Sequence, residues 1–281
     1  MSEHSRQIQD EITKMVLANP SPLLESVARE LVDYTVVFVG VKNGRMGPGA
    51  VGTLVSLAGE YYFLTAAHVW NLLKKGDIIR IPLKENVPCK FAIRPQEIEP
   101  FVVYAGWDNQ WGPDMALLRI RPDHAGSLLA VGRTFYPLSI KREPPVGSSV
   151  LIWFLMGAPN VFGDYSPEYS IPDLHGMNVV PRTEPFQTLV VEPAVQPLYD
   201  FVEIDVDTTQ PEVASNYEGV SGGGFWSVYV YKDKNADIKT RKILDGIAFY
   251  QFRRKTDLTV RCHGPQSIGE LLRSFMSAGL K

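Results

Sequence analysis

The stretch 218-EGVSGGGFW-226 places three glycines directly after a serine. Glycine loses more backbone entropy on folding than any other residue, so it is kept where the backbone takes unusual dihedral angles or approaches another group closely. A tight hairpin between two strands needs such a turn. A reactive serine needs one as well, because neighbouring N–H groups must point at a substrate oxygen. The rest of the chain decides between the two.

The composition indicates a globular protein rich in short strands. The 281 residues can form one large domain or two small ones, and 45% of them are hydrophobic. The 23 glycines and 21 prolines favour many short strands over long helices. A formal charge of −3 argues against nucleic acid as the main partner, because phosphate binding needs a basic face.

The sequence also predicts the compartment. No run approaches the length of apolar residues that spans a membrane, so we expect no membrane partner. Residues 1–15 are polar and lack the apolar segment of a secretory signal. We therefore expect a cytoplasmic protein in which Cys89 and Cys262, the two cysteines, stay reduced.

Hydrophobic periodicity divides the chain into a helical start, two β-rich halves and a final helix. Residues 5–31 carry helical spacing with a break at 19–22, and a helix is predicted from 267. A proline-containing connection near 121–146 separates the halves. The predicted strands are 34–41, 50–59, 60–70, 76–83, 89–95 and 115–120, then 147–157, 186–193, 200–206, 224–232 and 242–252. Many short strands of this kind are typical of paired β-barrels or a sandwich.

Two further residues carry chemistry that fits a reactive serine. Among the five histidines, only His68 has an apolar, small-residue frame (63-FLTAAHVW-70), and we place it at the end of a strand. Asp114 opens the apolar strand 112-GPDMALLRI-120, and a carboxylate entering a buried strand is costly without a partner. A histidine accepts a proton near neutral pH, and a carboxylate can orient it. Asp108, in 106-GWDNQ-110, is the nearest competing carboxylate.

These three segments resemble the motifs of the chymotrypsin-like (trypsin-like) serine peptidase family, of the bacterial intracellular type. LTAAHV resembles the histidine motif of that family, DMALL its aspartate motif and GVSGG its serine motif, in the same order. The segments 52–69 and 146–159 resemble its first strands and the start of its second barrel. The resemblance covers residues 33–275.

The resemblance implies an all-β fold of two packed six-stranded β-barrels, with an N-terminal helical extension and a C-terminal helix. The implied boundaries are 1–32 for the extension and 33–281 for the peptidase domain, with barrels at about 33–130 and 145–265 and the helix at 267–279.

It also implies a serine endopeptidase that hydrolyses protein or peptide substrates through an acyl-enzyme, without metal or cofactor. His68, Asp114 and Ser221 would be the catalytic triad. The N–H groups of Gly219 and Ser221 would form the oxyanion hole.

Four residues around Ser221 add detail. We expect Gly222 and Gly223 to keep side chains out of the path of the substrate, and Gly224 has no assigned role. Val220 stands where many secreted members carry an aspartate that pairs with a newly cleaved N-terminus. We therefore expect the oxyanion hole to form without cleavage in 32–36. The helices at 5–31 would pack on the barrel, recruit a partner protein through their apolar faces, or serve only as a solubilising extension.

Two other functions stay open. The sequence GVSGG also fits the serine elbow of α/β-hydrolases, and Asp257 and His263 follow it in the required order, which would give an esterase-like hydrolase. That elbow leads into a helix, whereas a strand pattern follows Ser221. A protease fold kept only for binding is the other alternative. The segment 261-RCHGP-265 is predicted to be a turn between the last strand and the terminal helix.

The resemblance also leads to a prediction of specificity. It places Ser215 near the floor of the substrate pocket, with Tyr250 and Gln251 in the wall at 248–251. A neutral floor and a bulky Gln251 favour small or medium uncharged side chains at the cleavage site. Profiling with a peptide library tests this, and a dominant preference for Lys or Arg would contradict it.

Overall fold

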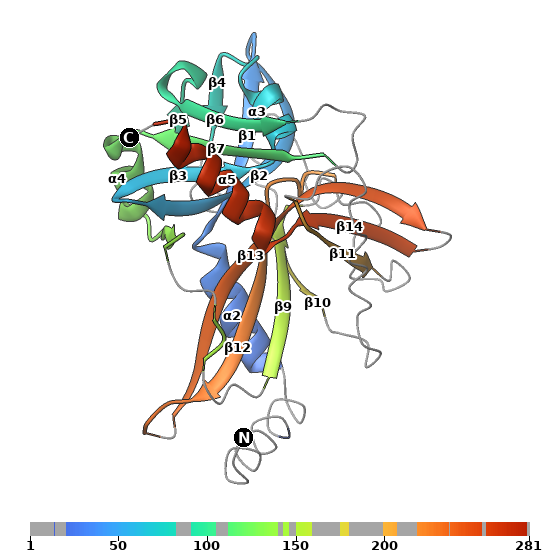
Figure 1. Cartoon of the computed structure of the whole chain (residues 1–281). Helices are drawn as coiled ribbons and strands as arrows, with labels where there is room; N and C mark the ends of the chain where they lie inside the picture. Colours follow the sequence, from blue (N-terminus) through green and yellow to red (C-terminus); the bar gives the residue numbers. More distant parts are fainter. Residues whose placement is uncertain are drawn as a thin grey trace.

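The computed structural model describes Lys14 and residues 21–82, 91–104, 112–139, 143–145, 150–158, 175–179, 199–206, 218–235, 237–254 and 257–279. Two antiparallel sheets dominate it, one above the other in Figure 1, and a long C-terminal helix crosses from one to the other.

The first sheet is built from residues 35–137. Its order is β5-β4-β1-β2-β3-β7-β6, and β8 pairs with β2. The strands are β1 (Thr35–Lys42), β2 (Arg45–Leu57), β3 (Glu60–Thr65), β4 (Ile78–Arg80), β5 (Ala92–Ile93), β6 (Glu99–Tyr104), β7 (Asp114–Ile120) and β8 (Tyr136–Pro137). Helices α3 (Ala67–Leu73) and α4 (Pro122–Ala130) and the 3-10 turn η1 (Pro95–Glu97) lie in its connections.

The second sheet follows in the order β10-β9-β12-β13-β14-β11. Its strands are β9 (Val150–Gly157), β10 (His175–Val179), β11 (Phe201–Val206), β12 (Gly224–Lys232), β13 (Ile238–Arg254) and β14 (Asp257–His263). Strands β12 and β13 form a long hairpin. Its loop is held by the Asp233 carboxylate, which accepts hydrogen bonds from the N–H groups of Asn235 and Asp237.

One hydrophobic core joins the two sheets. It contains buried residues from β3 and β7, from β9, β12 and β13, and from helices α2 (Ser21–Val32) and α5 (Pro265–Ser277). Trp226, which is fully buried, lies near its centre with its ring 5.1 Å from that of Tyr136 and 5.3 Å from that of Tyr34. A second core, containing Phe38 and Phe63, packs on the first sheet beneath α3 and α4.

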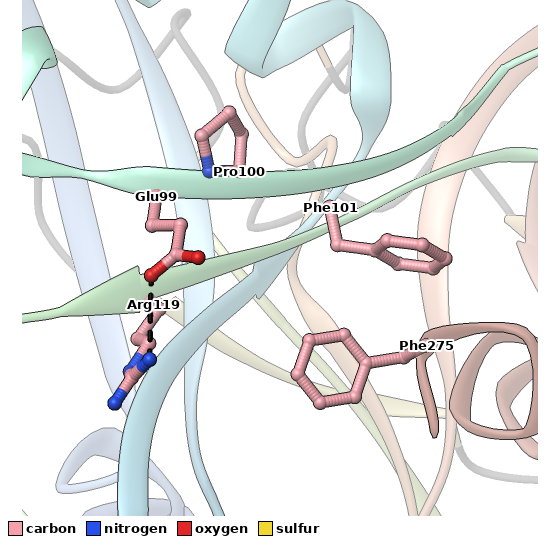
Figure 2. A pocket seen from close by; sticks show the side chains of 5 residues that line it. All are labelled: Glu99, Pro100, Phe101, Arg119 and Phe275. Atoms are coloured by element: carbon pink, nitrogen blue, oxygen red, sulfur yellow. Dashed lines mark hydrogen bonds and ion pairs between the residues drawn. The ribbon is translucent and has the colours of Figure 1, made fainter. Parts of the chain in front are cut away.

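Helix α5 closes the side of the molecule where the sheets meet. Figure 2 shows its Phe275 facing Phe101 of β6, with ring centroids 5.4 Å apart and planes at 79°. Beside them, Arg119 of β7 and Glu99 of β6 form an ion pair across neighbouring strands. The C-terminal helix is therefore part of the packed structure.

The predicted fold class is confirmed: the chain is mostly β, in two antiparallel sheets, with a helix at the C-terminal end. The first sheet has eight strands in the described part rather than six, because β5 and β8 add pairings of two residues each. The division of the chain into an extension and two barrels at the stated boundaries stays a prediction.

Several elements differ from the sequence prediction. Residues 122–130 form helix α4, because Pro122 stands in the first turn, where its missing N–H costs nothing, and Asp123 follows it. The strand predicted over 60–70 ends at Thr65, and helix α3 begins at Ala67. Strands β6, β8, β10 and β14 were not predicted. The strand predicted at 186–193 lies outside the described residues.

Helix α2 packs on the shared core. Val27 and Leu31 are 1% and 0% exposed, and Glu30 forms an ion pair with Lys242 of β13. The chain continues directly into β1: the Thr35 hydroxyl and the Tyr34 N–H both donate to the Leu31 carbonyl. Of the described helices, none is long and apolar enough to cross a membrane.

If α2 belongs to the folded domain, Leu31→Ala should lower the free energy of unfolding by about 3 kcal/mol, because it leaves a cavity in the shared core. Leu129→Ala is the matched control, since Leu129 also lies on a helix but is 44% exposed, and its effect should stay within about 0.5 kcal/mol. Urea unfolding measures both. Equal effects would mean that α2 adds nothing to the core.

Candidate active site

His68 and Asp114 are joined by two hydrogen bonds. The His68 backbone N–H donates to Asp114 Oδ1 at 2.9 Å, and His68 Nδ1 lies 2.6 Å from Asp114 Oδ2. An ionised carboxylate only accepts, so Nδ1 carries the proton, and in a neutral ring Nε2 is the nitrogen that holds the lone pair. The two side chains are 16% and 12% exposed. The pair is thus largely withdrawn from water but still reachable.

The register of the first sheet explains this contact. Strands β3 and β7 are antiparallel, and Thr65 pairs with Ala116. The chain leaving Thr65 therefore runs past the start of β7, which is Asp114. His68 is the second residue of α3. This corrects the prediction that it ends a strand, and the turn from strand to helix aims its ring at the carboxylate.

The turn that carries Ser221 is bonded to both sheets. From the first sheet, the Val51 N–H donates to the Ser221 carbonyl at 3.2 Å, and the Thr53 hydroxyl donates to the Gly222 carbonyl at 3.2 Å. On the second sheet, the Ala248 carbonyl accepts the Gly222 N–H at 2.7 Å. Ser221 therefore lies at the junction of the sheets, and the residue is half-buried.

Gly222 brings this turn against the segment that leads to His68. It has a φ of +90°, and a Cβ on it would lie 2.0 Å from the Val51 carbonyl oxygen and 2.1 Å from Thr65 Oγ1. The Thr65 hydroxyl itself donates to the Val51 carbonyl at 2.7 Å. Only two residues separate Thr65 from His68, so the structure brings the surroundings of Ser221, His68 and Asp114 together.

The other two glycines are also required by close packing. A Cβ on Gly223 would lie 1.8 Å from the Met156 carbonyl oxygen of β9, and one on Gly224 would lie 2.4 Å from Trp226 Nε1. The approach of neighbouring groups is thus one reason for Gly222 and Gly223, and clearance for a substrate stays a prediction. Gly224, which had no assigned role, makes room for the buried indole.

The predicted oxyanion donors lie on either side of Val220. Gly219 has a φ of +93°, a conformation that favours glycine. The neighbouring N–H groups of Gly222 and Gly223 donate to carbonyls within the protein. Among the described residues, no backbone carbonyl accepts the N–H of Gly219 or Ser221. Those two donors are the pair that the sequence singled out.

Val220 is a core residue. It is 2% exposed and belongs to an apolar cluster of the second sheet with Leu155, Phe225 and Val260. A Cβ on Gly157 would lie 2.7 Å from Val220 Cγ1, so the valine occupies the space beside Gly157. The side chain at this position is held by apolar packing, which needs no ammonium partner.

The predicted pocket is described only in part. Ser215 lies outside the described residues, as does Asp108. Tyr250 is 37% exposed on β13, and Gln251 next to it is half-buried. The Arg261 guanidinium lies 5.9 Å from the Tyr250 ring centre and is paired with Glu203 at 2.7 Å. Arg261 is therefore neutralised by Glu203, and the specificity stays a prediction.

One site residue was missed by the sequence analysis. His263, assigned to a turn, is the last residue of β14 and is fully buried. Its Nε2 accepts the Asp114 backbone N–H at 3.1 Å. The only sequence signal is that it ends the alternating segment 257-DLTVRCH-263, and nothing in that segment points to a residue 149 positions away.

The surroundings of His263 keep it neutral. Burial lowers its pKa from 6.5 to about 4, against the opposing attraction of the carboxylates of Asp114 and Asp200. Phe249 stacks on the ring at 4.1 Å and 20°. Next to it, burial raises the pKa of the Cys262 thiol, which is free. Cys89, the second predicted thiol, lies outside the described residues.

Comparison with known proteins finds similarity only in structure. No family model matches the chain, and no curated protein matches it. A serine endoprotease from Yersinia pestis superposes with a TM-score of 0.45 at 14% identity, covering 91% of this chain and 67% of its own. The thermostable serine protease AL20 from an extremophilic microorganism gives 0.46 at 13%, covering 87% and 96%. A Glu endopeptidase gives 0.44 at 13%, covering 87% and 92%. Similarities this weak do not say what the chain does.

The neutral state of His263 has a consequence for stability. In the unfolded chain His263 binds a proton near pH 6.5, whereas in the folded protein it does so only near pH 4. Its contribution to the free energy of unfolding is therefore fully present above pH 6.5 and is lost as the pH falls from 6.5 to 4, by up to about 3 kcal/mol. His263→Gln removes this titration. Urea unfolding at about pH 4.5 and 7.5 should show a smaller loss for the variant than for the wild type. Equal losses would contradict the assignment.

Proposed function

We propose that the protein is a serine endopeptidase that hydrolyses peptide bonds through an acyl-enzyme. The observation that carries the proposal is the doubly bonded pair of His68 and Asp114, with the Ser221 turn packed against the segment leading to His68. Such a pair presents an imidazole whose second nitrogen is ready to accept a proton.

In the proposed reaction, Ser221 Oγ attacks the carbonyl carbon of the peptide bond and its proton passes to His68 Nε2. Asp114 holds the ring in the required tautomer and stabilises the imidazolium. The tetrahedral intermediate collapses as the C–N bond breaks, and His68 returns the proton to the leaving amine. Water then attacks the ester with the same histidine as base. The acid product leaves, and the proton returns to Ser221 Oγ.

The N–H groups of Gly219 and Ser221 would hold the negative oxygen of each intermediate. Such donors are worth most when they are fixed before the reaction, because no reorganisation is then needed. The anchoring of the turn by Val51, Thr53 and Ala248 supports this role. The residues of 32–36 are already packed against α2 and β2, which supports an oxyanion hole that needs no cleavage there.

The alternatives differ in what they explain. In an α/β-hydrolase, the serine elbow opens a helix, whereas here Gly224 opens strand β12 and the sheets are antiparallel. A silent binding module would have no use for the two-point contact of His68 with Asp114. An esterase activity on the same fold would use the same residues, so the choice of substrate separates it from a peptidase.

Labelling with an alkyl fluorophosphonate tests the proposal. The full-length protein should take up one probe on Ser221, read by intact mass, and Ser221→Ala should take up none. Cleavage of a peptide library by the same preparation then distinguishes a peptidase from an esterase. A folded wild-type protein that is never labelled would leave the binding module as the better account.

Asp114→Asn should leave the fold intact and lower kcat by about 10⁴, because the amide favours the wrong tautomer of His68, as measured for this change in a Ser-His-Asp triad. Peptide turnover is measured beside circular dichroism of both proteins. Asp108→Asn is the control and should be near wild type. If Asp108→Asn abolishes turnover while Asp114→Asn is harmless, the assignment of the aspartate is wrong.

A further inference from the structure

We propose that His263 is a positioning residue for Asp114: its neutral ring accepts the Asp114 backbone N–H and so fixes the carboxylate against His68. The inference rests on the proposed function for its catalytic meaning. His263 would not touch the substrate. It would act through the start of strand β7, from the opposite sheet.

The contact that carries the inference is a buried bond between the two halves of the molecule. The Asp114 N–H donates to His263 Nε2 at 3.1 Å, and the ring is fully buried. Asp114 is the first residue of β7 and pairs with Tyr104 of β6, but its backbone N–H donates to His263 on the other sheet. His263 supplies a fixed acceptor at the very residue whose carboxylate must stay within 2.6 Å of His68 Nδ1.

The ring is itself locked by the second sheet. Phe249 stacks on it at 4.1 Å and 20°, and Phe201 lies at 5.4 Å and 43°. Phe249 directly follows Ala248, whose carbonyl accepts the Gly222 N–H. Two consecutive residues of β13 therefore hold the serine turn and the ring that holds Asp114. This fixes the nucleophile and the carboxylate relative to each other.

The buried His263 ring carries an unsatisfied donor, which indicates that the acceptor Nε2 is the reason for a histidine at this position. Since Nε2 accepts, Nδ1 must carry the proton, and within the described residues this buried N–H has no partner. An aromatic hydrocarbon would fill the space between Phe249 and Phe201 without leaving a donor unsatisfied. The charged groups facing the ring are Asp114 on β7 and Asp200 before β11. The hydrogen bond to the Asp114 N–H is what the histidine provides and a phenyl ring does not.

Three variants separate positioning from packing. His263→Phe keeps an aromatic ring but loses the acceptor, and His263→Gln places an amide oxygen near the position of Nε2. His124→Phe is the control, since His124 also packs on an aromatic ring, 5.9 Å from Phe91, but lies on α4. The rate of labelling of Ser221 by an alkyl fluorophosphonate should fall about 10²-fold in His263→Phe through the inactivation rate constant, with the probe's binding constant unchanged.

His263→Gln should recover most of this rate, and His124→Phe should match the wild type. If His263→Phe reacts as fast as the wild type, or if His263→Gln is as slow as His263→Phe, the positioning role is overturned.

A second measurement does not depend on activity. In the ¹⁵N-histidine-labelled wild type at about pH 7, NMR should show His263 as the neutral tautomer protonated at Nδ1 and a downfield proton on His68 Nδ1. That proton should persist in His263→Gln and be lost in His263→Phe. A His263 protonated at Nε2 overturns the proposal even if His263→Phe fails to fold. If the fluorophosphonate does not label the wild type but these NMR results are obtained, the proposed peptidase function is rejected and the contact between His263 and Asp114 is retained.

Discussion

The geometry of the candidate active site depends on one close approach of backbone, at Gly222. The Val51 carbonyl and the Thr65 hydroxyl occupy the space that any side chain at this residue would need. Because Val51 belongs to β2 and Thr65 ends β3, this single point sets the distance between the serine turn and the chain that leads to His68. A larger residue here would separate the sheets before it affected any reacting group directly.

The shared core gives that approach its rigidity. Its residues come from both sheets and from α2 and α5, so the sheets cannot rotate against each other without exposing buried apolar surface. The polar groups of the site lie at the rim of this core. Asp114 begins β7 of the first sheet and His68 lies on α3 beside it, whereas Ser221 precedes β12 and His263 ends β14 of the second sheet. Hydrophobic packing thus fixes polar geometry, and the hydrogen bonds set only the final orientation.

The sequence predicted the parts of the site that local patterns encode. The frames of His68 and Asp114 were recognisable because a polar residue inside an apolar run needs a partner, and the structure places them in contact. Most strands followed from β-branched runs between glycines. Helix α4 does not follow from the pattern, because Pro122 is as typical of a connection as of the first turn of a helix. His263 could not be predicted, because its partner is fixed by sheet register over 149 residues.

The free thiol of Cys262, next to His263, can report on the opening of the second sheet. Cys262 lies on β14, between β13 and β11, and is fully buried. A thiol reagent can reach it only when those strands part, and burial also disfavours the reactive thiolate. The rate at which Cys262 is modified under native conditions is therefore a measure of how often this sheet opens. Because His263 is the next residue, the same openings release the ring from Asp114, so the thiol reports the intermittent disassembly of the site.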